Sequence, residues 1–289
     1  MNAENNALDF RDPGPMSHEL LSVPGFVNEL KNHTLAVAPR PNEPLAFAGA
    51  LAMLAHLTGR SYVDERGSHT NLYLAALAPT GMGKDEPRVI NKELAAAVGI
   101  LDSVPDSIAS GEGLEDAVAA SPSLLLQTDE ADALLTALRG GDSRASRMNE
   151  MVLRFFSESR SGHAMRLRAG QKRPTIIHLP HLTLFATGIP KFVYGALNRK
   201  ALENGLLGRC LFIETDDFQP LGEVELRFVE HLLRDVGREC RGPADGFGGH
   251  QRRFGVLRDC VEGGKLDCLL VETAVERCGG LEIGLEEAA

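Results

Sequence analysis

The most informative feature of this 289-residue chain is an apolar run that leads directly into a glycine-rich loop and a lysine. Residues 72–84 read Leu-Tyr-Leu-Ala-Ala-Leu-Ala-Pro-Thr-Gly-Met-Gly-Lys, which predicts a buried strand, a phosphate-cradling loop and then a helix. Gly81 and Gly83 allow the loop to curl with its N–H groups inward, and Lys84 is placed to reach the β- and γ-phosphates of a nucleotide. The candidate nucleotide-binding residues are therefore Pro79, Thr80, Gly81, Met82, Gly83, Lys84 and Asp85.

Two positions of this loop depart from the pattern G-x-x-x-x-G-K-[ST]. Ala78 stands where the first glycine is expected, and Asp85 stands where a hydroxyl would bind magnesium. A carboxylate at position 85 can hold the metal directly or through water, but it also brings negative charge close to the phosphates. Taken alone, the loop is equally consistent with an ordinary junction between a strand and a helix.

A second apolar run ends in two adjacent acids. Residues 124–130 read Leu-Leu-Leu-Gln-Thr-Asp-Glu, so Asp129 can hold Mg²⁺ through water while Glu130 orients and deprotonates an attacking water. In isolation the simpler interpretation is favoured, in which Asp129 only caps the next helix. Its place about 45 residues after Lys84 reverses this preference, because a phosphate loop followed by an acidic strand end is the usual arrangement of P-loop ATPases. The two motifs together predict binding of ATP or GTP with Mg²⁺.

The apolar patterns alternate between strands and helices. They predict strands at about 71–77, 124–128, 182–187 and 210–214, and helices at about 44–59, 84–98, 130–138 and 146–158. Such alternation predicts an α/β fold with a mostly parallel central sheet and helices on both faces, preceded by a helical N-terminal lead-in. We expect a leader and linker over 1–43, a P-loop domain over 44–236, and an atypical tail containing glycine and cysteine over 237–289.

The charge of the chain is uneven. With 30 basic and 40 acidic residues the formal charge is −10, which argues against a protein that coats nucleic acid with its whole surface. The segment from Arg139 to Arg173 nevertheless holds nine basic and three acidic residues. This contrast predicts a local surface for single-stranded nucleic acid, but a solvated face held by salt bridges explains it as well.

No apolar run is long enough to cross a membrane, and the N-terminus does not resemble a signal peptide, so a cytoplasmic protein without membrane contact is expected. Five cysteines, an odd number, fit that compartment. The spacing of the four in the last fifth of the chain does not resemble a zinc site.

Several short motifs occur in a specific order, and together they resemble one family. They are Asn-Leu-Tyr-Leu at 71–74, the loop 78–85, Ser-Gly-Glu-Gly-Leu at 110–114, Asp129-Glu130, Leu-Thr-Leu-Phe-Ala-Thr-Gly-Ile-Pro at 182–190, and Asn-Gly-Leu-Leu-Gly-Arg at 204–209. This order resembles a P-loop ATPase family of prophages and mobile elements, which is often associated with primase-polymerase domains and is similar to the helicase half of primase-helicases. The resemblance covers about residues 40–215.

The resemblance implies a RecA-like or AAA-like fold that hydrolyses ATP with Mg²⁺ and acts on nucleic acid in mobile-element or phage replication. It further implies a homo-oligomer and a separate primase or polymerase partner. An aspartate after the loop lysine is common in that family, so Asp85 is compatible with it.

Two further site residues come from the resemblance. Thr187, near the end of its strand, corresponds to a polar sensor of the γ-phosphate or attacking water, although it is equally an ordinary polar strand end. Arg209 corresponds to an arginine that stabilises transition-state charge, commonly across a subunit interface. The alternative for Arg209 is a surface ion pair with an acid such as Glu203.

Two other functions stay open. Ala78, Asp85 and the tail are also compatible with an interaction module that binds nucleotide without hydrolysing it. The tail over 237–289 is compatible with a truncated remnant of a primase-helicase.

Overall fold

The structure is a computed structural model, and it describes residues 17–129, 131–138, 143–197 and 205–216. Four features singled out in the sequence lie outside the described residues: Glu130, Arg139, Glu203 and the tail over 237–289. The side chain of Arg144 also lies outside them.

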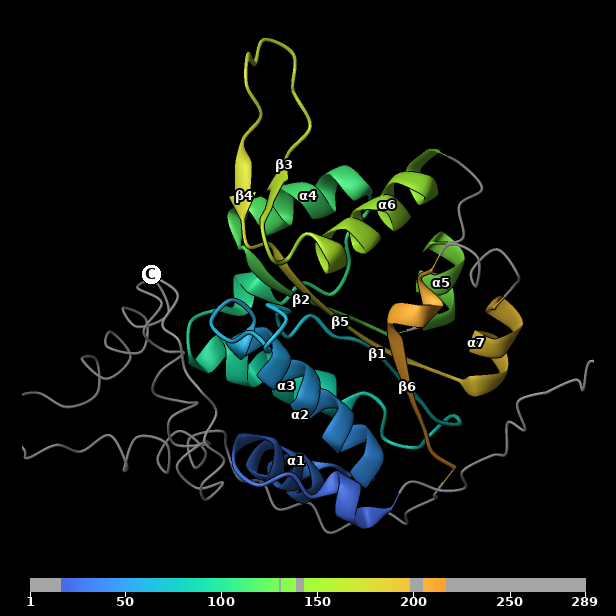
Figure 1. The fold of residues 1–289 in the computed structure, drawn as a ribbon. Helices are drawn as coiled ribbons and strands as arrows, with labels where there is room; N and C mark the ends of the chain where they lie inside the picture. Colours follow the sequence, from blue (N-terminus) through green and yellow to red (C-terminus); the bar gives the residue numbers. More distant parts are fainter. Residues whose placement is uncertain (1–16, 130, 139–142, 198–204, 217–289) are drawn as a thin grey trace, which may run out of the picture.

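A four-stranded parallel sheet forms the centre of the fold (Figure 1). Its strands are β1 (Tyr73–Leu77), β2 (Ser123–Thr128), β5 (His181–Gly188) and β6 (Cys210–Glu214), in the order β2-β5-β1-β6. β1 and β5 are buried along their whole length, as expected for strands covered on both faces. The predicted α/β fold and parallel sheet are therefore confirmed.

Helices cover both faces of the sheet (Figure 1). One face is covered by α2 (Glu43–Thr58) and α3 (Glu86–Ala97), with α1 (Phe26–Val37) packed against α2 in the same core. The other face is covered by α4 (Gly111–Ala120), α5 (Ala131–Leu138), α6 (Ser143–Ser157) and α7 (Pro190–Ala196). The described part of the chain also contains three short 3₁₀ helices: η1 (His18–Leu21), η2 (Leu101–Ser103) and η3 (Leu207–Arg209). Because side chains alternate along a strand, Leu74 and Ala76 enter the first core while Tyr73 and Leu77 enter the second.

Helix α1 lies within the segment 1–43 that the sequence predicted as leader and linker. Phe26, Val27 and Leu30 of this helix are buried in the first core, against α2. Asn42 caps the N-terminus of α2, since its side chain accepts a hydrogen bond from the Leu45 N–H at 3.2 Å. The helical lead-in therefore begins well before residue 44.

An antiparallel hairpin projects from the domain (Figure 1). Its strands are β3 (Gly162–Ala164) and β4 (Ile176–His178), joined by the hairpin loop over 165–175. Leu179 connects the hairpin to β5 with φ of 46°, a left-handed conformation that is uncommon for a residue with a side chain. The sequence did not predict this hairpin.

None of the helices in the described part of the chain is long and apolar enough to cross a membrane.

Two buried histidines form a polar cluster between α2 and the sheet. His56 of α2 and His181 of β5 both lie 3.2 Å from the Ser123 hydroxyl through their Nδ1 atoms. Burial lowers the pKa of His56 to about 4. It also lowers the pKa of His181 to about 3, with a further contribution from His56. Both rings are therefore neutral in the folded protein at neutral pH.

This cluster predicts acid sensitivity. Below about pH 6.5 the unfolded chain binds protons at these histidines while the folded chain does not, so the free energy of unfolding falls as the pH falls toward 4. For His56 alone we expect a loss of about 2 kcal/mol between pH 7.5 and pH 5. Urea denaturation at both pH values measures it. His56→Asn should shrink the loss, whereas His178→Asn, at an exposed position, should leave it unchanged.

Candidate functional site

The glycine-rich loop joins β1 to α3 at the carboxyl edge of the sheet. The Ala78 N–H donates to the Gly188 carbonyl of β5 at 3.0 Å, and the Met82 side chain is buried in the first core. Both contacts hold the loop, while Pro79 and Thr80 remain exposed. Lys84 follows, half-buried, directly before α3 and its free N-terminal N–H groups.

The loop glycines are required by the backbone. Gly81 and Gly83 have φ of 82° and 78°, which favours glycine. A Cβ at Gly83 would also overlap the carbonyl oxygen of Arg40. Ala78 has no left-handed φ, so an alanine fits where the motif has its first glycine.

Thr187 and Asp129 come together at the same edge of the sheet. β5 lies between β1 and β2, so its end is adjacent both to the glycine-rich loop and to the acidic strand end. The Thr187 hydroxyl donates a hydrogen bond to Asp129 Oδ1 at 2.9 Å. The structure thus joins two residues that lie 58 positions apart in the sequence.

Arg88, in the first turn of α3, was missed by the sequence interpretation. Its Nη2 atom lies 2.7 Å from Asp85 Oδ1 and 3.4 Å from Asp129 Oδ2. The backbone carbonyl of Arg88 accepts a hydrogen bond from the Gln127 amide at 2.9 Å, which fixes this turn to β2. The i,i+3 spacing between Asp85 and Arg88 was the available signal for the pair.

The two aspartates fit a magnesium ion that arrives with a nucleotide. Mg²⁺ takes oxygen ligands and is usually held by one or two carboxylates together with water and substrate phosphates. The side chains of Asp85 and Asp129 are 74% and 52% exposed, and Thr187 fixes the orientation of Asp129. Within the described ranges, no group of three or more His, Cys, Asp or Glu residues could hold a metal by itself.

The surroundings of the two aspartates are rich in carboxylates. Burial raises the pKa of the neighbouring Glu86, and the negative charges of Glu93 and Asp85 raise it further. Added negative charge is therefore unfavourable here unless a cation balances it.

Arg209 lies at the opposite edge of the sheet. It precedes Cys210, which pairs with Tyr73 at the amino end of β1, so the length of β1 separates it from the loop by on the order of 15 Å. Its guanidinium donates to the Gly205 carbonyl at 2.8 Å and lies 5.5 Å from the centre of the Phe156 ring. Within one chain, the structure does not bring Arg209 together with Lys84 or Asp129.

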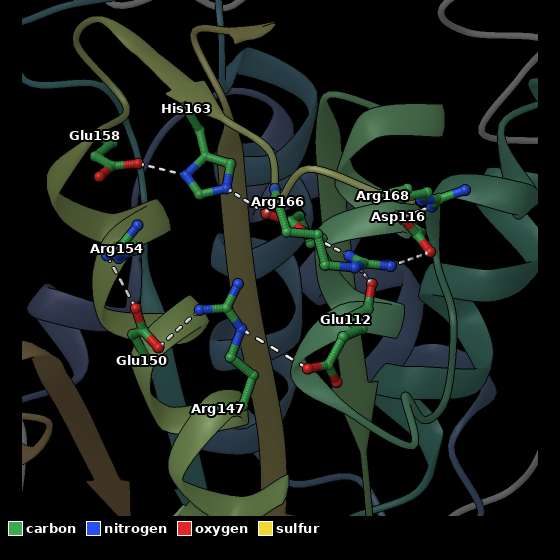
Figure 2. Close-up of polar contacts among 10 residues, drawn as sticks. Glu112, Asp116, Arg147, Glu150, Arg154, Glu158, His163, Arg166 and Arg168 are labelled. Carbon is green, nitrogen blue, oxygen red and sulfur yellow. Dashed lines mark hydrogen bonds and ion pairs between the residues drawn. The ribbon is translucent and has the colours of Figure 1, made fainter. Parts of the chain in front are cut away.

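Three arginines of the basic segment pair with acids of α4 (Figure 2). Arg147 pairs with Glu150 at 2.8 Å and with Glu112 at 3.8 Å. Arg166 pairs with Asp116 at 2.9 Å, and Arg168 pairs with the same carboxylate. For these three arginines the structure therefore agrees with the second interpretation of the basic segment, a solvated face held by salt bridges.

The base of the hairpin is held by a buried carboxylate that sequence reasoning also missed. Glu115 of α4 accepts hydrogen bonds from His163 Nε2 at 2.8 Å, from the Arg166 backbone N–H at 3.0 Å and from the Arg166 guanidinium. The other ring nitrogen of His163 lies 2.6 Å from Glu158 (Figure 2). Nothing in the spacing of these residues pointed to such a cluster, because it depends on how α4 packs against the hairpin.

Neither a scan against protein-family models nor a search of curated proteins finds a match to this chain.

Proposed function

We propose that the chain is a P-loop ATPase with a RecA-like or AAA-like fold that acts on nucleic acid. The observation that carries the proposal is the hydrogen bond between Thr187 and Asp129, at the sheet edge where the glycine-rich loop ends in Lys84. The strand order supports it, because β5 lies between the loop strand and the acidic strand and so brings Thr187 next to Asp129.

Each residue at this edge has a chemical task in the proposal. Lys84 and the backbone N–H groups of residues 80–85 bind the phosphates. Asp129, with Asp85, holds Mg²⁺, which neutralises phosphate charge. Glu130 orients water and accepts its proton, and Thr187 keeps Asp129 oriented and senses the γ-phosphate.

Arg209 is assigned to a neighbouring subunit's nucleotide in this proposal, because it is too far from the site of its own chain. Hydrolysis would then require a homo-oligomer, and specific activity would rise with protein concentration. The contacts of Arg209 with Gly205 and Phe156 leave a purely structural role as the alternative. A primase or polymerase would be a separate partner in mobile-element replication.

Isothermal titration calorimetry with Mg·ATP, followed by a phosphate-release assay with and without single-stranded DNA, tests the proposal. We expect saturable binding and release of phosphate that DNA stimulates. Binding without release would favour the interaction module, and Glu130→Gln would then behave like the wild type. Absence of binding at millimolar ATP would contradict the proposed function.

One observation favours the module that does not hydrolyse nucleotide. Arg88 pairs with both aspartates proposed to hold magnesium. If that pairing persists with nucleotide bound, the metal loses its carboxylates and hydrolysis fails.

We place the nucleic-acid contact at the hairpin loop. Lys172 and Arg173 are exposed there, and neither forms an ion pair with any residue that the structure describes. Exposed Leu167 adds apolar surface. From the whole segment Arg139 to Arg173, we therefore propose only this loop as the contact with single-stranded nucleic acid. The hairpin is followed in the chain by β5, which carries Thr187.

Replacing Lys172 and Arg173 together with glutamine should weaken binding of single-stranded DNA for all sequences alike. Each lost phosphate contact removes roughly 0.7 from the slope of log affinity against log salt. Fluorescence anisotropy with oligo-dT across a salt series measures it. Arg154→Gln, which removes an arginine already paired with Glu150 at 2.9 Å, is the matched control. Equal slopes for all three proteins would remove the hairpin from the DNA contact.

A further inference from the structure

Arg88 is an internal cation positioned between the two aspartates. A single nitrogen, Nη2, contacts Asp85 at 2.7 Å and Asp129 at 3.4 Å. An optimal arginine-carboxylate pair instead uses two parallel N–H···O bonds. The buried Nε of Arg88 has no hydrogen-bond partner within the described part of the chain. The guanidinium is therefore bound less tightly than it would be if it formed two parallel hydrogen bonds with one of the carboxylates.

The same oxygens are those that would bind magnesium. Thr187 occupies Asp129 Oδ1, which leaves Oδ2 directed to Arg88. A divalent cation bound by both aspartates would compete with the guanidinium for these oxygens, because two cations cannot share them without strong repulsion. The side chain of Arg88 is 16% exposed, so its charge is poorly screened by water.

We propose that Arg88 is a positioning residue that neutralises Asp85 and Asp129 when no nucleotide is bound, and that it yields them to magnesium when a magnesium-nucleotide complex enters. This proposal rests on the proposed nucleotide site. Arg88 keeps free divalent cations from occupying the empty site, and it lowers the repulsion between the aspartates and incoming phosphates. The metal is then accepted together with the nucleotide.

The metal alone provides a test that does not depend on nucleotide binding. Mn²⁺ is titrated into nucleotide-free protein, and bound metal is measured by electron paramagnetic resonance. We expect Arg88→Gln to bind Mn²⁺ at least tenfold more tightly than the wild type, because the competing charge is gone. Adding Asp129→Asn to Arg88→Gln should remove the gain. Arg154→Gln, which leaves the two aspartates untouched, should behave like the wild type.

A second measurement separates exchange from a permanent clamp. The ratio of the ADP dissociation constants without and with Mg²⁺ should rise at least tenfold in Arg88→Gln, since unneutralised aspartates repel the metal-free nucleotide. In the wild type, exchange requires Mg²⁺ to tighten ADP binding, whereas a permanent clamp would give the same ADP dissociation constant with and without Mg²⁺ and would overturn the exchange.

Arg88→Lys is the second variant if Arg88→Gln does not fold. Its shorter side chain pairs with one carboxylate at a time, so its Mn²⁺ affinity should exceed that of the wild type several-fold. Equal Mn²⁺ affinity in the wild type and the folded Arg88 variant would overturn the proposal. If ADP binds to no variant while the Mn²⁺ gain is present, the nucleotide site fails and the competition by Arg88 stands.

Discussion

Lys84→Ala is expected to lower the affinity for Mg·ATP by about 100-fold and to leave the fold intact. A charge-assisted hydrogen bond to phosphate contributes up to about 3 kcal/mol, which corresponds to about two orders of magnitude in the dissociation constant. Lys84 is half-buried and belongs to neither hydrophobic core, so its loss should change the melting temperature little. Calorimetry measures the affinity, and circular dichroism follows the melt.

A matched control is available on the other face of the sheet. Lys191→Ala removes an exposed lysine of α7, a helix of the second core, with the same change in net charge. It should bind Mg·ATP like the wild type. Equal affinity of Lys84→Ala and Lys191→Ala would end the interpretation of residues 78–85 as a phosphate loop.

The central sheet could be predicted from the sequence because β1 and β5 are buried along their whole length and β2 is buried between its two ends. β1, β2 and β5 are continuous apolar runs whose ends are marked by glycine or acids. The hairpin strands β3 and β4 have three residues each and little burial, so they leave no periodic signal. Helix α1 was missed because its apolar residues lie in a short segment between prolines and polar residues.

The sequence predicted only those site residues that directly follow a strand. The glycine-rich loop and Asp129 each follow one strand, so the local sequence identifies both. The contact of Thr187 with Asp129 needs the strand order β2-β5-β1, which the sequence does not contain. The charge of the segment 139–173 likewise does not reveal the acids that pair with Arg147 and Arg166, because α4, outside that segment, supplies them.

Glu115→Gln is expected to destabilise the protein by about 2–3 kcal/mol, with the hairpin affected most. The carboxylate is 1% exposed and accepts hydrogen bonds from both His163 and Arg166. Arg166 keeps Asp116 and His163 keeps Glu158 in the variant, so the loss comes from replacing a charged acceptor of buried hydrogen bonds with a neutral amide. For a domain of this size the melting temperature should fall by roughly 10 °C. Hydrogen exchange over 162–178 should rise more than exchange in β1.

The pH of this measurement matters. Burial raises the pKa of Glu115, but the hydrogen bonds from His163 and Arg166 outweigh burial, so the net shift is downward. The stabilisation is therefore fully present above the ordinary pKa of 4.5 and is lost as the pH falls through the lowered value. At pH 7 the difference between Glu115→Gln and the wild type is largest, and in strong acid the two should converge.

Glu150→Gln is the control for Glu115→Gln, because it replaces an exposed carboxylate of the same charged face. Glu150 pairs with Arg147 and Arg154, but its side chain is 40% exposed, so its replacement should cost less than about 1 kcal/mol. Similar losses for both variants would mean that the Glu115 cluster is an ordinary surface network.

If the hairpin binds single-stranded DNA, Glu115→Gln should also weaken DNA binding without altering the salt slope. Lys172 and Arg173 remain in this variant, while the base of the hairpin that orients them is loosened. Unchanged DNA affinity in a variant with a loosened hairpin would place the nucleic-acid contact elsewhere on the molecule.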